Sequence, residues 1–186
     1  MIEEIYMKII FETERLIIRE WEMSDKEDLY EYASDPIVTK YLTFPTYTCL
    51  QDAVDRINYL KNQYNDDTQI RDYAIELKSI NKVIGAIGVV SYLSTADGIA
   101  EIGYCMNKNF HGNGYMTEAL LGYFKHIKSI GIAKRIEAKH DVENFKSGNV
   151  MKRAKMTFEG IRRKAGKNNL HNRHDLATYS ILFEEI

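Results

Sequence analysis

The sequence predicts an α+β domain with a mixed, largely antiparallel central sheet of about seven strands flanked by helices. Two observations lead to this prediction. Three strand-like segments at 72–78, 82–93 and 99–107 follow one another with only short polar turns between them, which is typical of an antiparallel meander. At Tyr115 the apolar period then changes from about 2 to about 3.6 residues, which indicates a long amphipathic helix.

One strand and two helices are expected before the meander. Residues 15–21 have the apolar and β-branched content of a strand, and the sequence SDKE at 24–27 matches a helix capping box. Residues 48–51 repeat the capping pattern before a segment at 53–64 whose apolar residues fall on one helical face.

The second half of the chain alternates helices and strands. The long helix is expected to end at Gly131. Its apolar stripe consists of Met116, Ala119, Leu120, Tyr123, Phe124, Ile127 and Ile130. A strand at 135–140, a short helix at 147–155 and a final strand at 175–183 follow, so the order is about β-α-α-β-β-β-α-β-α-β-β.

Length and composition indicate one cytoplasmic domain over residues 1–186. The chain has 45% hydrophobic residues and two prolines, enough for one core, and a net charge of −2 that disfavours nucleic acid as a partner. Its N-terminal segment has no basic region, long apolar stretch or cleavage site, so neither a signal peptide nor a membrane partner is expected. Cys49 and Cys105 are too few for a disulfide framework or a zinc site.

Two glycines, Gly112 and Gly114, separate the last strand of the meander from the long helix. Such a loop exposes unpaired N–H groups at a helix N-terminus and lets an anionic ligand approach the backbone. From the spacing alone, a tight strand-to-helix turn explains the glycines equally well. The loop is no P-loop, because Tyr115 follows Gly114, and Thr117 makes it a weak match to the dinucleotide fingerprint.

Residues 100–120, AEIGYCMNKNFHGNGYMTEAL, resemble the acetyl-CoA-binding segment of the GNAT superfamily of N-acetyltransferases. In the branch that acetylates the N-termini of ribosomal proteins, the loop commonly reads Gly-x-Gly-Tyr-Ala-Thr-Glu-Ala, which differs here only at Met116. Segments 11–21, 141–160 and 174–185 also resemble that branch, so the resemblance covers nearly the whole chain in order. It implies the GNAT-like acyl-CoA N-acyltransferase fold.

Three residues depart from the family's pattern. His111 stands where Gln or Arg is usual, Met116 where Ala or Gly is usual, and Lys155 where a glycine normally ends the short helix. Because the phosphate contacts that the resemblance implies come mainly from backbone amides, these departures bear on affinity more than on chemistry.

The resemblance implies acetyl-CoA as a cosubstrate and no metal. The residues that it places at the cosubstrate are Cys105, Met106, His111, Gly112, Asn113, Gly114, Tyr115, Met116, Thr117 and Asn144. Within this set, the Cys105 N–H would bind the thioester carbonyl and Asn144 the pantetheine arm. The Cys105 thiol is not expected to act as a nucleophile, because no local motif pairs it with a histidine and the family transfers acetyl directly.

Two residues are predicted to be catalytic. Glu101 resembles the general base of the family's histone-acetylating members and would act through water, with a solvated strand carboxylate as the alternative. Ser147 would protonate the leaving thiolate, because Met151 stands where many members have a tyrosine acid. The alternative is that Asn144 caps the short helix and Ser147 is an ordinary first-turn residue.

The acceptor is expected to be a primary amine, and the resemblance favours a protein N-terminal α-amine. A small amine such as a polyamine, an amino acid or an antibiotic is the alternative, and a non-catalytic acyl-CoA-binding protein is a third reading. His171 and His174 lie three residues apart beside Asp175, but this spacing alone is weak evidence for zinc. The sequence leaves open whether the chain forms a homodimer.

Overall fold

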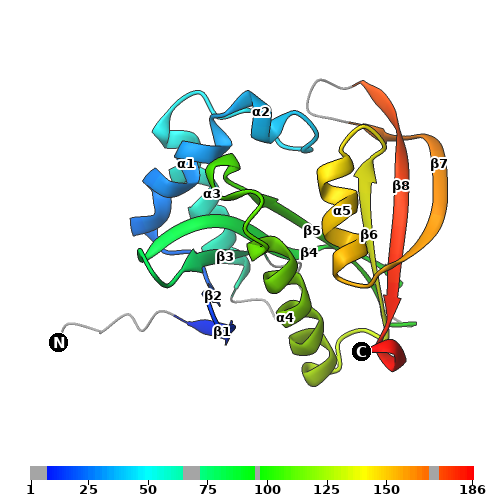
Figure 1. Ribbon diagram of the computed structural model, residues 1–186. Helices are drawn as coiled ribbons and strands as arrows, with labels where there is room; N and C mark the ends of the chain where they lie inside the picture. The colour runs from blue at the N-terminus through cyan, green and yellow to red at the C-terminus, as the bar shows by residue number, and fades with distance from the viewer. Residues whose placement is uncertain (1–7, 65–71, 95–96, 168–171) are drawn as a thin grey trace.

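The computed structural model describes residues 8–64, 72–94, 97–167 and 172–186, and shows one sheet with helices on both faces (Figure 1). The described part of the sheet has eight strands in the order β1-β2-β3-β4-β5-β6-β8-β7. Neighbouring strands are antiparallel except β5 and β6, which are parallel. The mixed, largely antiparallel sheet is confirmed, with one strand more than the seven expected.

The elements have the following bounds. The strands are β1 (Ile9–Glu12), β2 (Leu16–Arg19), β3 (Asp72–Leu77), β4 (Lys82–Ser94), β5 (Ile99–Met106), β6 (Arg135–Asp141), β7 (Thr157–Lys167) and β8 (Arg173–Leu182). The helices are α1 (Lys26–Ala33), α2 (Pro36–Thr39), α3 (Leu50–Gln63), α4 (Tyr115–Ile130) and α5 (Phe145–Arg153). Three short 3-10 helices are η1 (Met23–Asp25), η2 (Lys108–Phe110) and η3 (Phe183–Glu185).

The N-terminal part differs from the sequence prediction in two places. A separate strand, β1, precedes the expected strand and pairs with it as a hairpin. A short helix, α2, starts at Pro36, where the Asp35 carboxylate accepts a hydrogen bond from the Ile37 N–H (2.9 Å). Four residues are too few to show a helical period, so the pattern could not reveal α2.

The capping residues also differ from those predicted. Ser24 lies inside η1, and the Asp25 carboxylate accepts from the Glu22 N–H (2.8 Å) instead. At the start of α3, the Asp52 carboxylate accepts from the N–H groups of Thr48 (2.7 Å) and Cys49 (3.2 Å). Both helices exist as expected, but before each of them an aspartate carboxylate accepts hydrogen bonds from backbone N–H groups.

The two faces of the sheet carry different helices. Tyr73, Ile87 and Tyr104 lie side by side across β3, β4 and β5 and share one face. The Tyr73 ring lies edge-on to Tyr123 of α4, with ring centroids 6.3 Å apart, so this is the α4 face. Ala74, Ala86 and Cys105 form the next row and share the opposite face, where Tyr32 of α1 lies beside Cys105. We call this second side the α1 face.

Helix α4 matches its prediction closely. It begins after Gly114 and ends at Gly131, whose φ of 68° is the left-handed conformation that favours glycine. Every residue of the predicted stripe is buried except Ile130, which is 50% exposed. None of the helices in the described ranges is long and apolar enough to cross a membrane.

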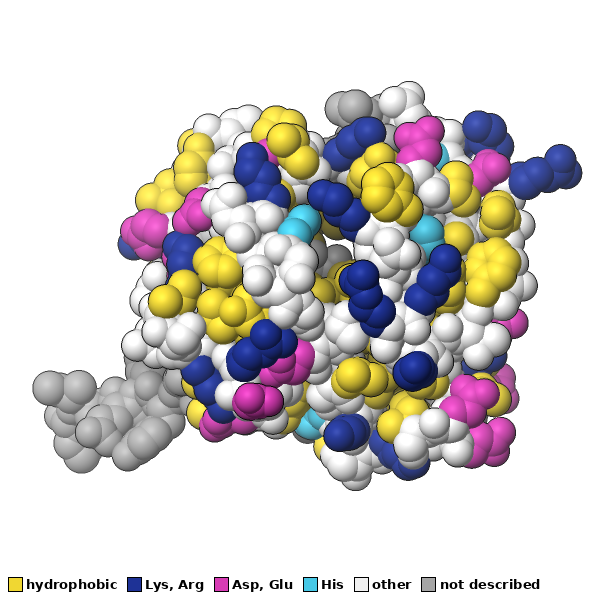
Figure 2. All heavy atoms as spheres, in the orientation of Figure 1, with side chains coloured by type: hydrophobic (Ala, Val, Ile, Leu, Met, Phe, Trp, Pro, Cys, Tyr) yellow, Lys and Arg dark blue, Asp and Glu magenta, His cyan; other side chains and the backbone are white. Residues whose placement is uncertain are grey.

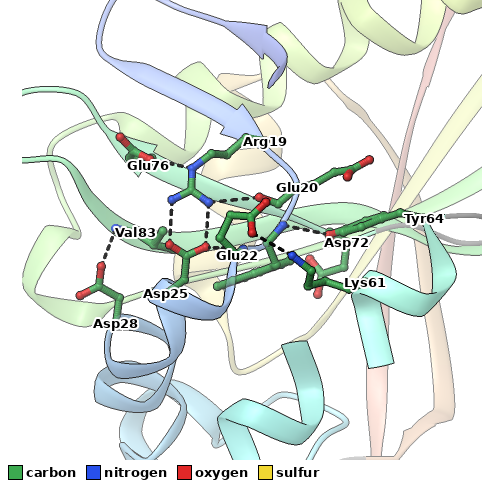
Figure 3. Close-up of polar contacts among 11 residues, drawn as sticks. Arg19, Glu20, Glu22, Asp25, Asp28, Lys61, Tyr64, Asp72, Glu76 and Val83 are labelled. Carbon is green, nitrogen blue, oxygen red and sulfur yellow. Dashed lines mark hydrogen bonds and ion pairs between the residues drawn. The ribbon is translucent and has the colours of Figure 1, made fainter. Parts of the chain in front are cut away.

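A buried arginine joins three elements of the N-terminal half (Figure 3). Arg19 of β2 is 4% exposed and donates to both carboxylate oxygens of Asp25 (2.7 and 2.8 Å) and to Glu76 of β3 (2.6 Å). Burial alone would lower the pKa of Arg19, but the two carboxylates raise it overall, so the charge stays compensated inside the protein.

We therefore predict that Asp25→Ala destabilises the protein by about 3 kcal/mol, because it leaves a buried arginine without its bidentate partner. Urea unfolding measures this change. Asp55→Ala is the matched control, because Asp55 is an exposed helix carboxylate whose partner among the described residues is Gln51, and it should cost less than about 0.5 kcal/mol. Equal midpoints for the two variants would contradict a structural role for the Arg19 network.

Candidate active site

The parallel pairing of β5 with β6 ends within the sheet. Ile102 lies opposite Ala138, and beyond these residues the two strands no longer pair with each other. However, β5 stays paired with β4 as far as Met106, and β6 stays paired with β8 as far as Asp141. The strands therefore part and leave a wedge between residues 103–106 and 139–141.

The β5 edge of the wedge offers main-chain polar groups to a ligand. The Asn107 N–H donates to the Ile84 carbonyl (2.8 Å), and hydrogen-bonded pairs alternate with non-bonded pairs along an antiparallel ladder. Cys105 is therefore bonded to β4, while the N–H groups of Tyr104 and Met106 face the wedge. In this register the Cys105 N–H faces β4, which argues against its predicted contact with a thioester carbonyl, and the N–H groups of Tyr104 and Met106 face the open side instead.

The loop before α4 contains two left-handed glycines. Gly112 has a φ of 84° and Gly114 a φ of 80°. Gly114 is the N-cap of α4, so the first N–H groups of the helix, from Tyr115 to Thr117, have no acceptor within the helix. These N–H groups lie at the positive end of the helix dipole and form a site for an anionic group such as phosphate.

Arg15, in the turn between β1 and β2, holds this loop. Its guanidinium donates to the Asn113 carbonyl (3.0 Å) and the Glu118 carboxylate (2.6 Å), and lies 4.5 Å from the centre of the Tyr115 ring. Glu118 also accepts from the Thr13 hydroxyl (2.6 Å). Burial alone would raise the pKa of Glu118, but these hydrogen bonds lower it overall and keep the carboxylate charged.

Three predicted cosubstrate residues have contacts within the protein. A ring nitrogen of His111 lies 3.0 Å from the Met106 carbonyl, and the Asn113 side chain donates to the Phe110 carbonyl (3.2 Å). Met116 is 7% exposed and packs in the core, so most of its bulk lies away from the loop. The two residues that depart from the family's pattern, His111 and Met116, thus have their side-chain contacts within the protein.

A cavity of about 690 Å³ runs from the wedge to the glycine loop. It is lined by every predicted cosubstrate residue except Asn113, and by Ser147 but not Glu101. The charged residues of its lining are Lys40, Lys108, Lys146, Arg153 and Glu143, four cations against one carboxylate. Figure 2 shows the hollow on this side of the molecule with Lys and Arg side chains around it. The cavity therefore suits a ligand with several negative charges.

Ser147 and Asn144 lie on the side of the cavity formed by α5. The Asn144 side chain accepts from the Ser147 N–H (3.4 Å), so Asn144 caps the helix and its amide NH₂ has no partner among the described residues. The Ser147 hydroxyl lies 3.0 Å from the Tyr104 hydroxyl, and burial raises the pKa of Tyr104. Tyr104 therefore stays protonated. Its hydroxyl donates to the Ser147 carbonyl (3.1 Å) and also lies within hydrogen-bond distance of the Ser147 hydroxyl, so the two hydroxyls form one hydrogen-bonded pair at the cavity wall.

Glu101 and Cys105 lie on the α1 face of β5. The Glu101 carboxylate accepts from Lys139 of β6 (2.7 Å) and from Ser91 (3.4 Å). Burial raises the pKa of the Cys105 thiol to about 12, so the thiol is protonated at neutral pH, in agreement with the expectation that it is no nucleophile. The base role of Glu101 stays a prediction.

One histidine of the pattern near the last strand lies beside a carboxylate. His174 lies 2.6 Å from the Asp141 carboxylate, while His171 is outside the described residues. No group of three or more potential metal ligands occurs in the ranges that the structure describes.

The sequence matches the acetyltransferase (GNAT) domain family over residues 15–157. The chain belongs to the GNAT family. It is 33% identical to the uncharacterized N-acetyltransferase p20 of Bacillus licheniformis over 151 residues, 81% of this chain and 84% of that protein.

Solved structures agree with this assignment. A GNAT acetyltransferase from Bacillus anthracis is 28% identical, with a TM-score of 0.81 over 93% of this chain and 98% of that one. RimL, a ribosomal L7/L12 α-N-protein acetyltransferase in complex with coenzyme A, is 22% identical, with a TM-score of 0.83 over 96% and 100% of the two chains. At 22% identity, the likeness to RimL shows a shared fold.

This GNAT enzyme uses acetyl-CoA as its cosubstrate, and the residues of the cavity fit that molecule. The N–H groups before α4 and the four cations match its phosphates, and the open edge of β5 can bond to its pantetheine amides. The Asn144 amide faces the same cavity.

Two residues of this site, Tyr104 and Arg15, escaped the sequence analysis. Tyr104 precedes Cys105 in a predicted strand. It lies two residues after Ile102, the last residue of β5 that pairs with β6. Its side-chain direction follows from strand alternation, but its contact with Ser147 depends on where α5 packs. Arg15 lies in the segment 11–21 that resembles the family, although nothing local links it to a loop nearly a hundred residues later.

We predict that Arg15→Gln weakens coenzyme A binding roughly tenfold, equivalent to about 1.4 kcal/mol, because the loop loses the cation that holds it. Isothermal titration calorimetry with coenzyme A measures this change. Lys26→Gln is the matched control, because it removes a half-exposed cation of α1 whose partner among the described residues is Glu27, at 3.7 Å. Equal affinities for the two variants would show that the loop holds its conformation without Arg15.

Proposed function

We propose that this GNAT acetyltransferase transfers the acetyl group of acetyl-CoA to the α-amine at a protein N-terminus. The observation that supports direct transfer to an amine most strongly is the wedge, where β5 and β6 part beside the Tyr104–Ser147 pair. A thioester bound on the α4 face could then be attacked by an amine from the α1 face. The RimL likeness and the loop sequence GNGYMTEA favour an N-terminal acceptor.

The proton affinities of amines support the same choice. A peptide α-amine has a pKa of about 7.7 to 8.0, so roughly a tenth or more is neutral at pH 7. A lysine amine near pKa 10.4 costs about 3.4 kcal/mol more to deprotonate than an amine near 7.9. An α-amine therefore places a smaller demand on the enzyme's base.

The reaction moves two protons. The acceptor ammonium loses one proton to a base, and its nitrogen lone pair forms a bond to the thioester carbonyl carbon. When the carbon–sulfur bond breaks, the electron pair stays on sulfur, and the second proton of the nitrogen must reach the thiolate or solvent. We assign to Ser147 the role of proton donor to the thiolate. The Tyr104 hydroxyl, 3.0 Å from the Ser147 hydroxyl, supports this role.

Ser147→Ala should lower kcat roughly tenfold or more with little change in acetyl-CoA affinity, because the hydroxyl acts mainly in the transition state. Release of free thiol under conditions where chemistry limits turnover measures kcat. Lys152→Ala, an exposed change on the same helix, serves as the control. An unchanged kcat in Ser147→Ala would reduce Ser147 to a first-turn helix residue.

The acceptor assignment has its own test. Peptides with a free N-terminus should be acetylated faster than the same peptides with that end blocked and one lysine available, and mass spectrometry locates the acetyl group. Acetyl groups found only on lysine or only on small amines such as spermidine would reject the N-terminal acceptor but leave N-acetyl transfer intact. Absence of thiol release with every amine would favour a non-catalytic acyl-CoA-binding protein.

A further inference from the structure

A group of polar side chains lies on the α1 face near the wedge. Arg56 of α3 donates to the Oδ2 atom of Asp72, at the start of β3 (2.9 Å). Tyr47 is close to Arg56, Cys105 and Asp72, and burial raises the pKa of Tyr47 to about 12, which keeps its hydroxyl neutral. Tyr32 lies beside Cys105. We call these five residues the Asp72 cluster.

The pairing of the strands places Asp72 in line with the wedge. Asp72 lies opposite Gly88 of β4, and Gly88 lies opposite Gly103, the first residue of β5 beyond its pairing with β6. Asp72 and Gly103 are thus two strands apart, about 10 Å at the usual spacing, and Gly88 between them has no side chain. Val90, 50% exposed, packs over Gly103 and gives this row an apolar border.

One oxygen of the Asp72 carboxylate is available to a ligand. Arg56 binds Oδ2, whereas Oδ1 has no partner among the described residues, and the side chain is 29% exposed. Burial raises the pKa of Asp72 in spite of the opposing effect of Arg56, so the carboxylate gains proton affinity. Within the described residues, Arg56 thus holds one carboxylate oxygen of Asp72 and leaves the other without a partner.

Glu101 lies on the same face but is engaged differently. Its Oε2 atom accepts from both Lys139 and Ser91, and Lys139 is nearly buried. Neutralising Glu101 would leave the Lys139 ammonium, 12% exposed, without its charge partner inside the protein, which is costly. Asp72 differs because its partner Arg56 is 37% exposed, so solvent can stabilise the guanidinium when the carboxylate takes up a proton.

We propose that Asp72 is the acceptor-side carboxylate, whose Oδ1 takes a proton from the primary amine through bridging water. This inference rests on the proposed function, because it requires the thioester to enter the wedge from the α4 face. One proton passes from nitrogen to Oδ1 through bridging water, and the freed lone pair forms the bond to the carbonyl carbon. When the carbon–sulfur bond breaks, its electron pair stays on sulfur, the thiolate takes the Ser147 proton, and the second proton of the nitrogen returns to Ser147. Asp72 releases its proton to solvent after the product leaves.

The test compares Asp72→Asn with wild type, using a peptide with a free N-terminal amine and spermidine as acceptors. The variant should lose roughly 100-fold in kcat/KM for the acceptor at pH 7, a typical loss for a general base. At pH 9.5, where most α-amines are already neutral, peptide kcat/KM should recover to within roughly tenfold of wild type. The acetyl-CoA-induced rise in Tm should be unchanged, and Asp55→Asn, on the exposed side of α3, should behave as wild type.

The dependence on pH offers a second measurement that does not need Asp72→Asn to fold. In wild type, kcat/KM should fall as the pH drops below the pKa of Asp72, because the protonated carboxyl cannot accept a proton. Arg56→Gln removes the cation that favours the carboxylate, so this acidic limb should move to higher pH. The other titratable groups of the cluster, Tyr32, Tyr47 and Cys105, have raised pKa values and stay neutral in this range.

Two results would overturn the proposal. One is a folded Asp72→Asn variant with wild-type kcat/KM at pH 7, together with an acidic limb that does not move in Arg56→Gln. The other is a loss rescued by high pH in Glu101→Gln but not in Asp72→Asn, which would return the base role to Glu101. Thiol release by the wild-type enzyme with either amine tests the proposed function separately from both results.

Discussion

The early end of pairing between β5 and β6 is the constraint on which the site depends. Each strand keeps its partner on the outer side, β4 or β8, so the sheet stays intact while its centre opens. A sheet normally satisfies the backbone groups of a central strand completely. Here the last residues of β5 turn backbone N–H groups toward the opening, and a ligand that lies along them can take the place of a strand.

The elements around the wedge bring different functional groups to the two faces of the sheet. On the α4 face, Gly114 begins a helix whose first N–H groups point to the cavity, and α5 brings Ser147 next to Tyr104. On the α1 face, α1 and α3 cover the neighbouring strands and bring Tyr32 and Arg56 to the edge of the opening. Cys105 lies between the cavity and the α1 face. Its thiol is protonated at neutral pH and therefore unreactive, which suits a position close to both substrates.

Much of this arrangement could be predicted from local patterns. The apolar stripe of α4, its start at the glycines and its end at Gly131 follow from period and residue type, and so does the meander from β3 to β5. The loop sequence resembles the GNAT family, which the comparisons confirm. Residues of the cosubstrate loop are contiguous in the chain, which explains why almost all of those predicted line the cavity.

The remainder depends on contacts between distant segments. No pattern near Asp72 indicates that β4 will present a glycine beside it, or that α3 will bring Arg56 to 2.9 Å. The place where β5 and β6 part is likewise set by packing, since residues 103–106 read as an ordinary strand. Short elements such as α2, with four residues, also escape periodicity. A side chain's role in such places is decided by topology rather than by its neighbours in sequence.

The bracing of the glycine loop by Arg15 also bears on the order of folding. Arg15 and Asn113 are 98 residues apart in the chain, so this contact can form only after the N-terminal hairpin and α4 have come together. Contacts of such sequence separation carry a large entropic cost of loop closure and tend to form late. A partly folded chain would therefore have the loop sequence without its final shape. Coenzyme A would then act as a ligand of the completed fold, and its whole binding free energy would add to the stability of the native state.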